Sequence, residues 1–392
     1  MTKTDVLVVG AGPAGSAAAL VLARAGVQVR LVDRARFPRE KLCGDTLNPG
    51  AMSILDRLGI GAAVRDRGQA ITGMTVSGPG GACVTADYPA GLQGAAITRR
   101  ELDLMLVEAA ARAGAQVEAG VIVRAPLIGD KRLSGVRIAA GTSDHDAYAR
   151  IVIAADGRHS KVAFHLGLAK FAMAPKRWAF GAYFIDVDGM TSRGEMHIRP
   201  DGYVGLSTLS GGVTNVCIVR ELRTSLRAHR INPEDVIADM VLRDPHLQER
   251  FARARQVSDV VSLGPLAIDT KAAGCPGLLL AGDAAGFIDP MTGDGLRFAL
   301  RGGELAAEAA LRELETNEVS HRTLAANRQR EFGGKWRVNR SLRWLTASPR
   351  SLGAVSALSA YWSSPIQRLI GVAGDCRLAQ KAPPPQPPAP EE

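Results

Sequence analysis

A turn with regularly spaced glycines near the amino terminus constrains the fold of this chain more than any other feature. Residues 5–9 read DVLVV, an apolar run that predicts a strand buried on both faces of a parallel sheet. The segment Gly10-Ala-Gly-Pro-Ala-Gly15 follows, and an Ala- and Leu-rich stretch to about residue 25 predicts a helix. A second strand, residues 27–32, ends at Asp33. This order of elements predicts a Rossmann-like α/β unit.

Each glycine of the turn has a separate physical role. Gly10 makes the tight turn, Gly12 lets the backbone approach a pyrophosphate, and Gly15 lets the helix pack closely on the strand. The helix N-terminus offers unpaired N–H groups and partial positive charge to phosphates. Asp33 stands where a carboxylate can accept hydrogen bonds from ribose hydroxyls. The predicted dinucleotide site at this turn comprises Gly10, Gly12, Pro13, Ala14, Gly15, Asp33 and Arg34.

Two later segments also end a predicted strand on a glycine and an aspartate. Residues 151–160 read IVIAADGRHS and carry Asp156-Gly157 after the strand. Residues 278–296 read LLLAGDAAGFIDPMTGDGL and carry Gly282-Asp283 after the strand, before a glycine-rich loop and a helix. A short carboxylate at the end of a strand is a good hydrogen-bond acceptor for a polyol chain.

The three motifs, in this order from Gly10 to Gly295, resemble those of the flavoprotein hydroxylase superfamily, which has a p-hydroxybenzoate-hydroxylase-like fold. The resemblance implies that the dinucleotide is FAD and that the first turn binds its ADP half. It also implies that Asp156-Gly157 lies near the pyrophosphate and that Asp283 binds the ribityl hydroxyls. A helix that begins near Gly293 and Gly295 would point N–H dipoles at the flavin pyrimidine and stabilise the anionic reduced ring.

The start of a further predicted helix resembles the same superfamily. Residues 98–102 read TRREL, and by its spacing Arg99 matches the arginine of an Arg-x-x-Leu pattern. The resemblance implies that Arg99 approaches the FAD phosphates. The alternative is an exposed helix arginine.

The segment from Arg36 to Gly50 reads RFPREKLCGDTLNPG and resembles a loop of geranylgeranyl-reductase-like flavoproteins and their monooxygenase and halogenase relatives. The resemblance implies that this loop passes over the isoalloxazine ring. Gly44 permits close approach of the backbone to the ring, and Cys43 would then lie near the flavin. Cys43 is thus a weak catalytic candidate, and the alternative is a small packing residue. No other catalytic side chain is indicated, since the flavin carries the chemistry.

The chain departs from two patterns of these relatives. Prenyl-lipid reductases carry a Tyr-x-Trp-x-Phe-Pro pattern, and the matching stretch here keeps only the tyrosine, Tyr203 in YVGLST. The Trp-x-Trp-x-Ile-Pro motif of flavin halogenases is absent from the sequence, so halogenation is not expected.

The length and the changing sequence patterns predict more than one domain. Residues 178–219 alternate and are broken by turns, which indicates a mainly antiparallel sheet. The tail contains PPPQPPAP and is expected to be disordered. We predict an FAD-binding domain of residues 1–70, 95–170 and 257–320, an inserted substrate domain of 71–94 and 171–256, a helical C-terminal region at 321–380 and a tail at 381–392.

Charge is concentrated near the carboxyl end of the chain. Of the net charge of +9, residues 321–350 contribute eight basic side chains against one acid, Glu331. With Trp336 and Trp344, this segment indicates contact with an anionic membrane surface or an acidic partner, and the alternative is a solvated helix face. Arg322, Arg328, Arg330, Lys335, Arg337, Arg340, Arg343 and Arg350 are the basic residues.

Other classes of site find no support in the sequence. The five cysteines are scattered without a CxxC pair, and the seven histidines form no HExxH motif, so neither a disulfide framework nor a metal site is indicated. Aromatic residues are only 5%, which argues against nucleic-acid binding by stacking. With no signal peptide and no long apolar run recognised, we expect a cytoplasmic protein, with peripheral contact to the inner face of the membrane as a further option.

The sequence leaves two principal functions open. The first is an NAD(P)H-dependent monooxygenase, with NADPH or NADH as reductant, that hydroxylates or epoxidises a hydrophobic small molecule. It is preferred because the prenyl-reductase pattern is reduced here to Tyr203, and it agrees with the absence of a second GxGxxG motif. The alternative is an FAD-dependent reductase of C=C bonds in a prenyl or other lipid, which would use the same site. A protein with a purely structural flavin is a third hypothesis, and nothing in the motifs favours it.

Overall fold

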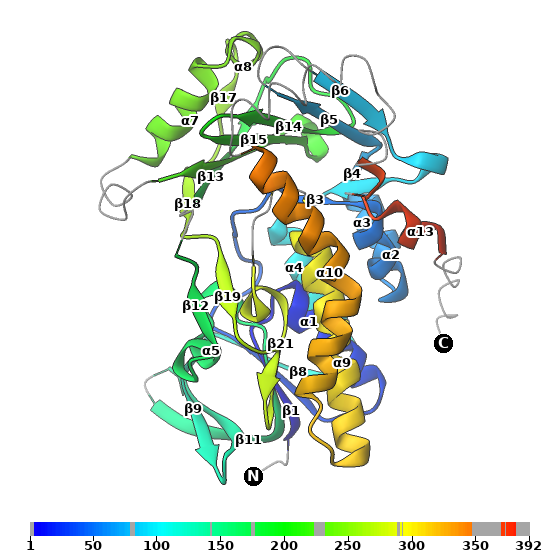
Figure 1. Cartoon of the computed structure of the whole chain (residues 1–392), viewed down its shortest axis with the longest axis vertical. Helices are drawn as coiled ribbons and strands as arrows, with labels where there is room; N and C mark the ends of the chain where they lie inside the picture. The colour runs from blue at the N-terminus through cyan, green and yellow to red at the C-terminus, as the bar shows by residue number, and fades with distance from the viewer. Residues whose placement is uncertain are drawn as a thin grey trace.

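The computed structural model describes residues 4–78, 83–141, 143–173, 177–222, 232–287, 291, 293–346, 370–372 and 374–381 (Figure 1). Two large sheets organise these residues, one in the lower and one in the upper half of the view. The expected α/β class, with a Rossmann-like unit, a mainly antiparallel second sheet and C-terminal helices, is confirmed. Residues 382–392, the rest of the predicted tail, lie outside the described residues.

The first sheet has the order β20-β21-β11-β1-β2-β8. From β21 to β8 the strands are parallel, while β9 and β10 extend β11 as an antiparallel meander. The carboxyl ends of the parallel strands therefore meet at one edge, as the sequence motifs require. The strands are β1 (Thr4–Val9), β2 (Val29–Asp33), β8 (Gln116–Ala119), β9 (Val121–Gly129), β10 (Arg132–Ala140), β11 (Ser143–Ala154), β20 (Gly274–Cys275) and β21 (Leu278–Leu280).

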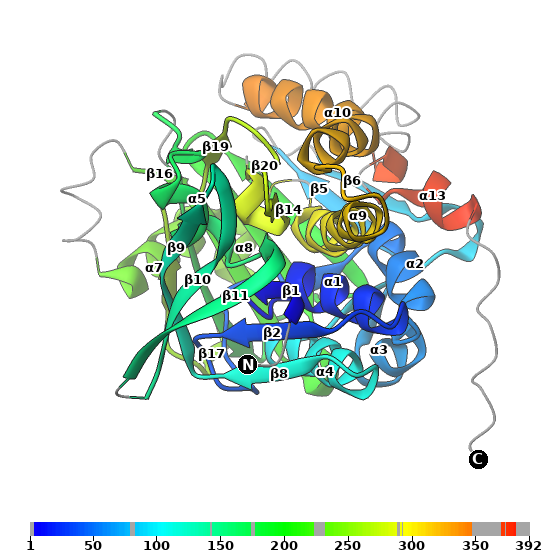
Figure 2. The ribbon, with the colours of Figure 1, turned by 90° about the horizontal axis from the view of Figure 1, so that it is seen from below.

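Several helices cover one face of this sheet. Helix α1 (Pro13–Arg24) packs between α4 (Arg99–Arg112) and α9 (Gly295–Thr316), and α10 (His321–Thr346) lies on the outer side of α9 (Figure 2). Thr98 caps α4 by accepting a hydrogen bond from the Glu101 N–H, which explains why that helix starts where the sequence predicts. Leucines of α1, α4 and α9 share one buried core.

The second sheet has the order β17-β13-β16-β15-β14-β5-β6, with β18 beside β13. Its pairs are antiparallel except for β14 with β5. Helices α7 (Pro233–Leu242) and α8 (Pro245–Arg250) cover its outer face. The strands are β5 (Gly73–Ser77), β6 (Cys83–Asp87), β13 (Arg177–Ile185), β14 (Arg193–Arg199), β15 (Gly202–Thr208), β16 (Thr214–Glu221), β17 (Arg255–Gln256) and β18 (Val261–Leu263).

Short elements connect the two sheets. Strands β3, β7 and β4 form a small sheet, and β12 pairs with β19. Helix α13 packs on α2. The remaining elements are β3 (Thr46–Leu47), α2 (Pro49–Arg57), α3 (Gly61–Arg67), β4 (Gln69–Ile71), η2 (Pro89–Gly91), β7 (Gly94–Ala96), η3 (Gly157–His159), α5 (Lys161–His165), β12 (Ala169–Phe171), η4 (Ser210–Gly212), β19 (Ile268–Thr270), η5 (Gly282–Ala285) and α13 (Cys376–Lys381).

The contact between α1 and α9 predicts the effect of a single added methyl group. A Cβ at Gly303 would stand 2.2 Å from the Ala14 carbonyl oxygen, so Gly303→Ala should lower the free energy of unfolding by about 1–3 kcal/mol. Gly334→Ala is the matched control, because Gly334 is an exposed glycine of α10 with open space around its Cβ. It should raise stability by roughly 0.5–1 kcal/mol. Urea denaturation measures both, and equal effects would contradict this packing.

Candidate functional site

Loops that follow four parallel strands meet at one edge of the first sheet. Their backbones are joined directly: the Gly10 N–H donates to the Val32 carbonyl (2.8 Å) and the Ala155 N–H to the Val9 carbonyl (2.8 Å). The Ala281 N–H donates in turn to Ala154 (2.9 Å). The sites predicted after β1, β2, β11 and β21 are therefore parts of one surface.

Two glycines of the first turn are required by close packing. Gly10 has φ +96°, and a Cβ there would stand 2.5 Å from the Ala155 carbonyl oxygen. A Cβ on Gly15 would stand 1.8 Å from the Gly10 carbonyl oxygen. At Gly12 the nearest atom to a Cβ is the end of the Arg39 side chain, at 3.3 Å. A Cβ on Gly12 would therefore press on the end of a flexible side chain and not on the backbone, and the approach of Gly12 to a pyrophosphate stays a prediction.

The N-terminus of α1 lacks a side-chain cap among the described residues. Gly12 is its N-cap residue, and a helix start of this kind suits an anion. Asp33 lies beside it and accepts hydrogen bonds from the N–H groups of Ala11 (2.7 Å) and Ala35 (2.8 Å). Arg34 is exposed next to it. The binding of a ribose by Asp33 stays a prediction, since these contacts establish only where its carboxylate is held.

Arg99 lies in a buried ionic network. Its guanidinium donates to both carboxylate oxygens of Asp103 (2.7 and 2.8 Å), and Arg39 bridges Asp103 to Asp33. Arg99 is 5% exposed, which rules out the exposed-helix alternative. Burial alone would lower its pKa, but Asp103 raises the pKa above the ordinary arginine value. The ion pairs extend from α4 to the first turn, where the phosphates of a dinucleotide would lie.

Arg158 and Asp283 approach each other from the loops after β11 and β21. Burial lowers the pKa of Arg158 to about 10, and Asp283 opposes this shift. Arg158 Nη1 is buried and has no hydrogen-bond partner among the described residues. Burial also lowers the pKa of Lys41, and the negative charge of Asp283 again opposes this shift. A buried donor of this kind fits the pyrophosphate of FAD, while the binding of the ribityl chain by Asp283 stays a prediction.

The structure places Asp156 differently from Asp283. Asp156 Oδ2 accepts a hydrogen bond from the Lys161 N–H (2.8 Å), at the first residue of α5. Burial raises the pKa of this carboxyl. Its neighbour Gly157 has φ +78°, and nothing lies within 4 Å of the position of a Cβ, so the backbone there is open to a ligand. Asp156 Oδ1 is buried without a hydrogen-bond partner among the described residues, so the contact of this pair with a cofactor stays a prediction.

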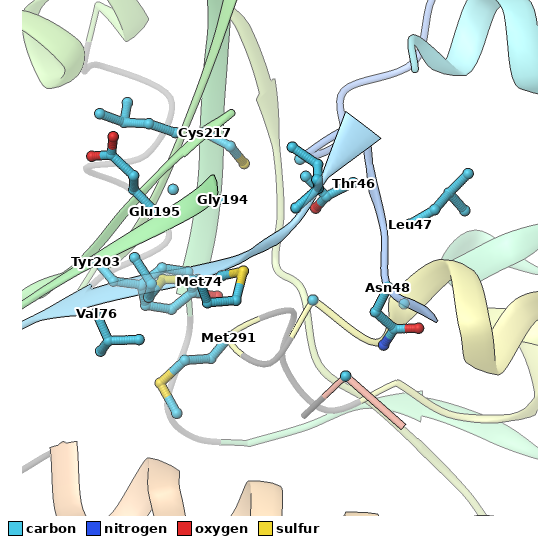
Figure 3. Close-up of a pocket in the computed structure, with 18 of the residues that line it drawn as sticks. Thr46, Leu47, Asn48, Met74, Val76, Gly194, Glu195, Tyr203, Cys217 and Met291 are labelled. Atoms are coloured by element: carbon cyan, nitrogen blue, oxygen red, sulfur yellow. The ribbon is translucent and has the colours of Figure 1, made fainter. Parts of the chain in front are cut away.

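A cavity of about 230 Å³ lies between the loop before β3, the start of α9 and the inner face of the second sheet. Thr46, Leu47 and Asn48 stand on one side of it, and Met74, Tyr203 and Cys217 on the other (Figure 3). All four residues predicted to face the flavin ring, Cys43, Gly44, Gly293 and Gly295, line this cavity. Its other lining residues include Ile71, Val76, Tyr88, Met196, Ile198, Leu206, Val219, Met291, Leu296 and Ile370.

The sheet side of the cavity is built from two neighbouring rows of residues. One row contains Cys217, Gly205 and Met196 on β16, β15 and β14, and the next contains Val219, Tyr203 and Ile198. A Cβ on Gly205 would meet nothing closer than 3.6 Å. Gly205 stands where the prenyl-reductase pattern has tryptophan, so the absence of a side chain here leaves room in the cavity.

The family of the chain follows from its relatives. The FAD binding domain family matches residues 3–309. The chain is an FAD-dependent oxidoreductase of this family. A menaquinone reductase of Mycobacterium tuberculosis is 32% identical over 373 residues, which cover 89% of this flavoprotein and 86% of that one. A digeranylgeranylglycerophospholipid reductase of Methanosarcina mazei is 30% identical, with 86% and 81% covered.

Solved structures support the fold. A geranylgeranyl bacteriochlorophyll reductase-like protein of Thermoplasma acidophilum aligns with a TM-score of 0.78 at 23% identity, covering 97% of the flavoprotein and 96% of that chain. Flavin-dependent halogenases share the fold as well. The relatives' names thus favour the reductase branch of the predicted resemblance, while the fold alone is common to several reactions.

The structure corrects one expectation for the basic segment of the flavoprotein. Arg328 and Lys335 are buried, and Trp336 packs inward against Phe332 with ring centroids 5.8 Å apart. Lys335 lies between Asp294 and Asp375. These side chains therefore belong to the interior and not to a solvated or membrane-facing surface. The side chains of Arg340, Arg343, Trp344 and Arg350 lie outside the described residues.

Cys43 lines the cavity, and its thiol is beside Arg99. Burial raises the pKa of this thiol, so Cys43 holds its proton rather than forming a thiolate. Its catalytic role stays a prediction.

No helix among the described residues is long and apolar enough to span a membrane.

Sequence reasoning missed Asp45, which lies between the predicted flavin contact Gly44 and the cavity residue Thr46. Asp45 is completely buried and accepts hydrogen bonds from Tyr183 (2.7 Å) and Asn215 (2.8 Å) of the second sheet. Burial raises the pKa of its carboxyl to about 7. The only local signal was a charged residue in the loop predicted to pass over the isoalloxazine ring.

The ribityl assignment predicts the outcome of removing one carboxylate. Asp283→Ala should weaken FAD binding by roughly ten- to a hundredfold, the usual range for lost hydrogen bonds to a charged group. The far-ultraviolet circular dichroism should not change. Equilibrium dialysis with FAD measures the affinity, and Asp269→Ala, at an exposed position of β19, is the control. Unchanged FAD affinity in Asp283→Ala would contradict the placement.

Proposed function

We propose that this flavoprotein is a reductase of C=C bonds in a lipid with an isoprenoid chain. The observation that carries the proposal is the apolar cavity, whose wall contains the four residues predicted to face the flavin ring. Menaquinone and digeranylgeranylglycerophospholipid, the lipids in the relatives' names, both carry isoprenoid chains. The relatives thus support the second of the two predicted functions better than the monooxygenase.

The residues of the chain would position the flavin ring and the substrate and would exclude water from the cavity. Bound FAD, once reduced, supplies the hydride that such a reaction needs. Gly44 and Gly293 leave space for a flat ring at the cavity wall, while Met74, Met196 and Leu296 exclude water from it. Cys43 would keep a proton at its Sγ next to the cavity. The methionines suit a flexible branched chain, because their side chains adapt to irregular shapes.

Mass spectrometry of the product tests the proposal against the monooxygenase. FAD-loaded protein would be reduced with NADPH, NADH or dithionite and incubated with menaquinone or a geranylgeranyl lipid, with and without oxygen. We expect a product whose isoprenoid chain is heavier by two hydrogens after any quinol has been reoxidised, and which forms equally well without oxygen. A product that gains one oxygen atom, and only in the presence of O₂, would overturn the reductase and establish the monooxygenase. The dithionite arm separates the reaction from the choice of nicotinamide donor.

We further propose that one exposed face of α10 meets anionic lipid, where such substrates reside. Arg322, Arg330 and Arg337 are exposed, and at about 100° per residue they lie on one side of the helix. Each arginine near an anionic surface contributes about 1 kcal/mol of attraction. These three arginines are the exposed members of the predicted basic patch among the described side chains.

Charge reversal tests this membrane contact. Changing Arg322, Arg330 and Arg337 to Glu should weaken binding to phosphatidylserine vesicles at least about tenfold, with a smaller difference at high salt. The control reverses three exposed basic residues elsewhere, Arg124, Lys131 and Lys170. Vesicle co-sedimentation measures binding. If both triple variants lose vesicle binding equally, net charge alone would explain the binding. The proposed contact through this face of α10 would then be contradicted.

A further inference from the structure

A row of polar residues crosses three neighbouring strands on the inner face of the second sheet. Tyr183 on β13 pairs in register with Asn215 on β16, which pairs with Ser207 on β15. The next row, two residues along each strand, contains Cys217 and Gly205 of the cavity wall. The polar row therefore borders the cavity without being part of its apolar surface.

This polar row holds three consecutive residues of the loop before β3. Asn215 Nδ2 donates to the Cys43 carbonyl (3.0 Å) and to Asp45 Oδ2 (2.8 Å). The Ser207 hydroxyl donates to the Gly44 carbonyl (3.2 Å), and the Tyr183 hydroxyl to Asp45 Oδ2 (2.7 Å). Every residue of the loop 43–45 is thus bound to the second sheet, which we call the substrate sheet.

Asp45 has a backbone conformation that needs such support. Its φ is +51°, in the left-handed region that non-glycine residues seldom adopt, although aspartate and asparagine tolerate it best. Its carbonyl accepts a hydrogen bond from the Ile97 N–H (2.9 Å). Such conformations persist where the surroundings hold them, and they concentrate at functional sites. Cys43 and Gly44, the two residues before it, line the cavity.

We propose that Asp45 is a positioning residue: by binding Tyr183 and Asn215 it fixes the loop 43–45 against the substrate sheet and so sets the wall at which flavin and substrate meet. The proposal rests on the proposed function for the identity of the substrate. The contact joins the loop before β3 to the second sheet, although Tyr183 and Asp45 are 138 residues apart in the chain. Asp45 would act through the loop and need not touch the substrate.

The charges around Asp45 make this contact sensitive to pH. Burial raises the pKa of its carboxyl from 3.8 to about 7, and Tyr183, Asn215 and Arg99 oppose that shift. The thiols of Cys43 and Cys217 are the other titratable groups that face it. Its Oδ1 is buried without a hydrogen-bond partner among the described residues, so the ionised form leaves charge there unpaired. We therefore expect the loop to be held best below about pH 7.

The sign of the stability effect follows from the direction of this shift. Because the pKa is higher in the folded state, protonated Asp45 favours the fold, and this contribution is lost as the pH rises from about 4 through about 7. Asp45→Asn removes the titration while keeping an oxygen acceptor for Tyr183 and Asn215 and tolerance of the positive φ. The unfolding free energy of Asp45→Asn should therefore vary less with pH than that of the wild type.

Tyr183→Phe tests the positioning role, because it removes one hydroxyl and keeps the ring. The exposed tyrosine variant Tyr148→Phe is the matched control. In Tyr183→Phe we expect kcat to fall roughly tenfold and the visible circular dichroism of bound FAD to change, while the FAD Kd stays within about threefold. Asp45→Asn should match wild-type kcat below pH 7 and lack the wild-type decline above it. The double variant should be no slower than Tyr183→Phe alone, since both act through one contact.

Two results would overturn the proposal. One is an unchanged flavin circular dichroism and kcat in Tyr183→Phe. The other is an identical pH profile of kcat and stability in wild type and Asp45→Asn. If no isoprenoid lipid is reduced by the wild type, the proposed function fails, but the circular dichroism and stability measurements still decide the role of Asp45, because they need no substrate.

Discussion

The close contact between the first glycine turn and the end of β11 is the constraint on which the rest of the structure depends. Gly10 lies against the backbone of Ala155 and Asp156 so tightly that no side chain fits there. A Cβ on Gly282, after β21, would stand 2.9 Å from the Ala14 Cβ, so this loop also packs closely on α1. These contacts draw the loops after β1, β11 and β21 into one surface, with α1 directed at it. A single extended cofactor can therefore contact segments that are far apart in sequence.

The second sheet divides its inner face between two tasks. The rows through Gly205 and Tyr203 are apolar or small and enclose the cavity. The row of Tyr183, Asn215 and Ser207 is polar and holds the loop that carries Cys43 and Gly44. Because adjacent rows lie on one rigid sheet, the position of the loop and the shape of the cavity are coupled. An apolar substrate and a polar attachment of the flavin-facing loop are thus compatible on one surface.

The sequence allowed the first sheet and its motifs to be predicted because they are local. The turn at Gly10, the strand end at Asp33 and the pair Gly282-Asp283 each carry their pattern within a few residues. The fold then brings them to one edge by the known topology of parallel strands. The inward positions of Arg328 and Lys335 could not be predicted, since the charge pattern of α10 contains no sign of the carbonyl of Ala285 or of Asp294 and Asp375. The same holds for Asp45, whose partners lie on strands far along the chain.

The branch of the family was harder to predict than the cofactor. The motif that distinguishes prenyl reductases is reduced here to Tyr203, which led the sequence to favour a monooxygenase. In the structure that change appears as open space at Gly205, which alters the shape of the cavity without removing its apolar character. Loss of a motif can therefore report a different substrate group as readily as a different reaction.

A crystal structure of the FAD-loaded protein with a bound isoprenoid analogue tests the central claim most directly. The claim is that the flavin ring lies against the cavity wall formed by Cys43, Gly44, Gly293 and Gly295, with the substrate chain on the opposite face of the ring, toward Tyr203. We expect density for the isoalloxazine against these four residues and for the analogue between it and Tyr203. A ring bound away from this wall, or an analogue bound outside the cavity, would contradict the account.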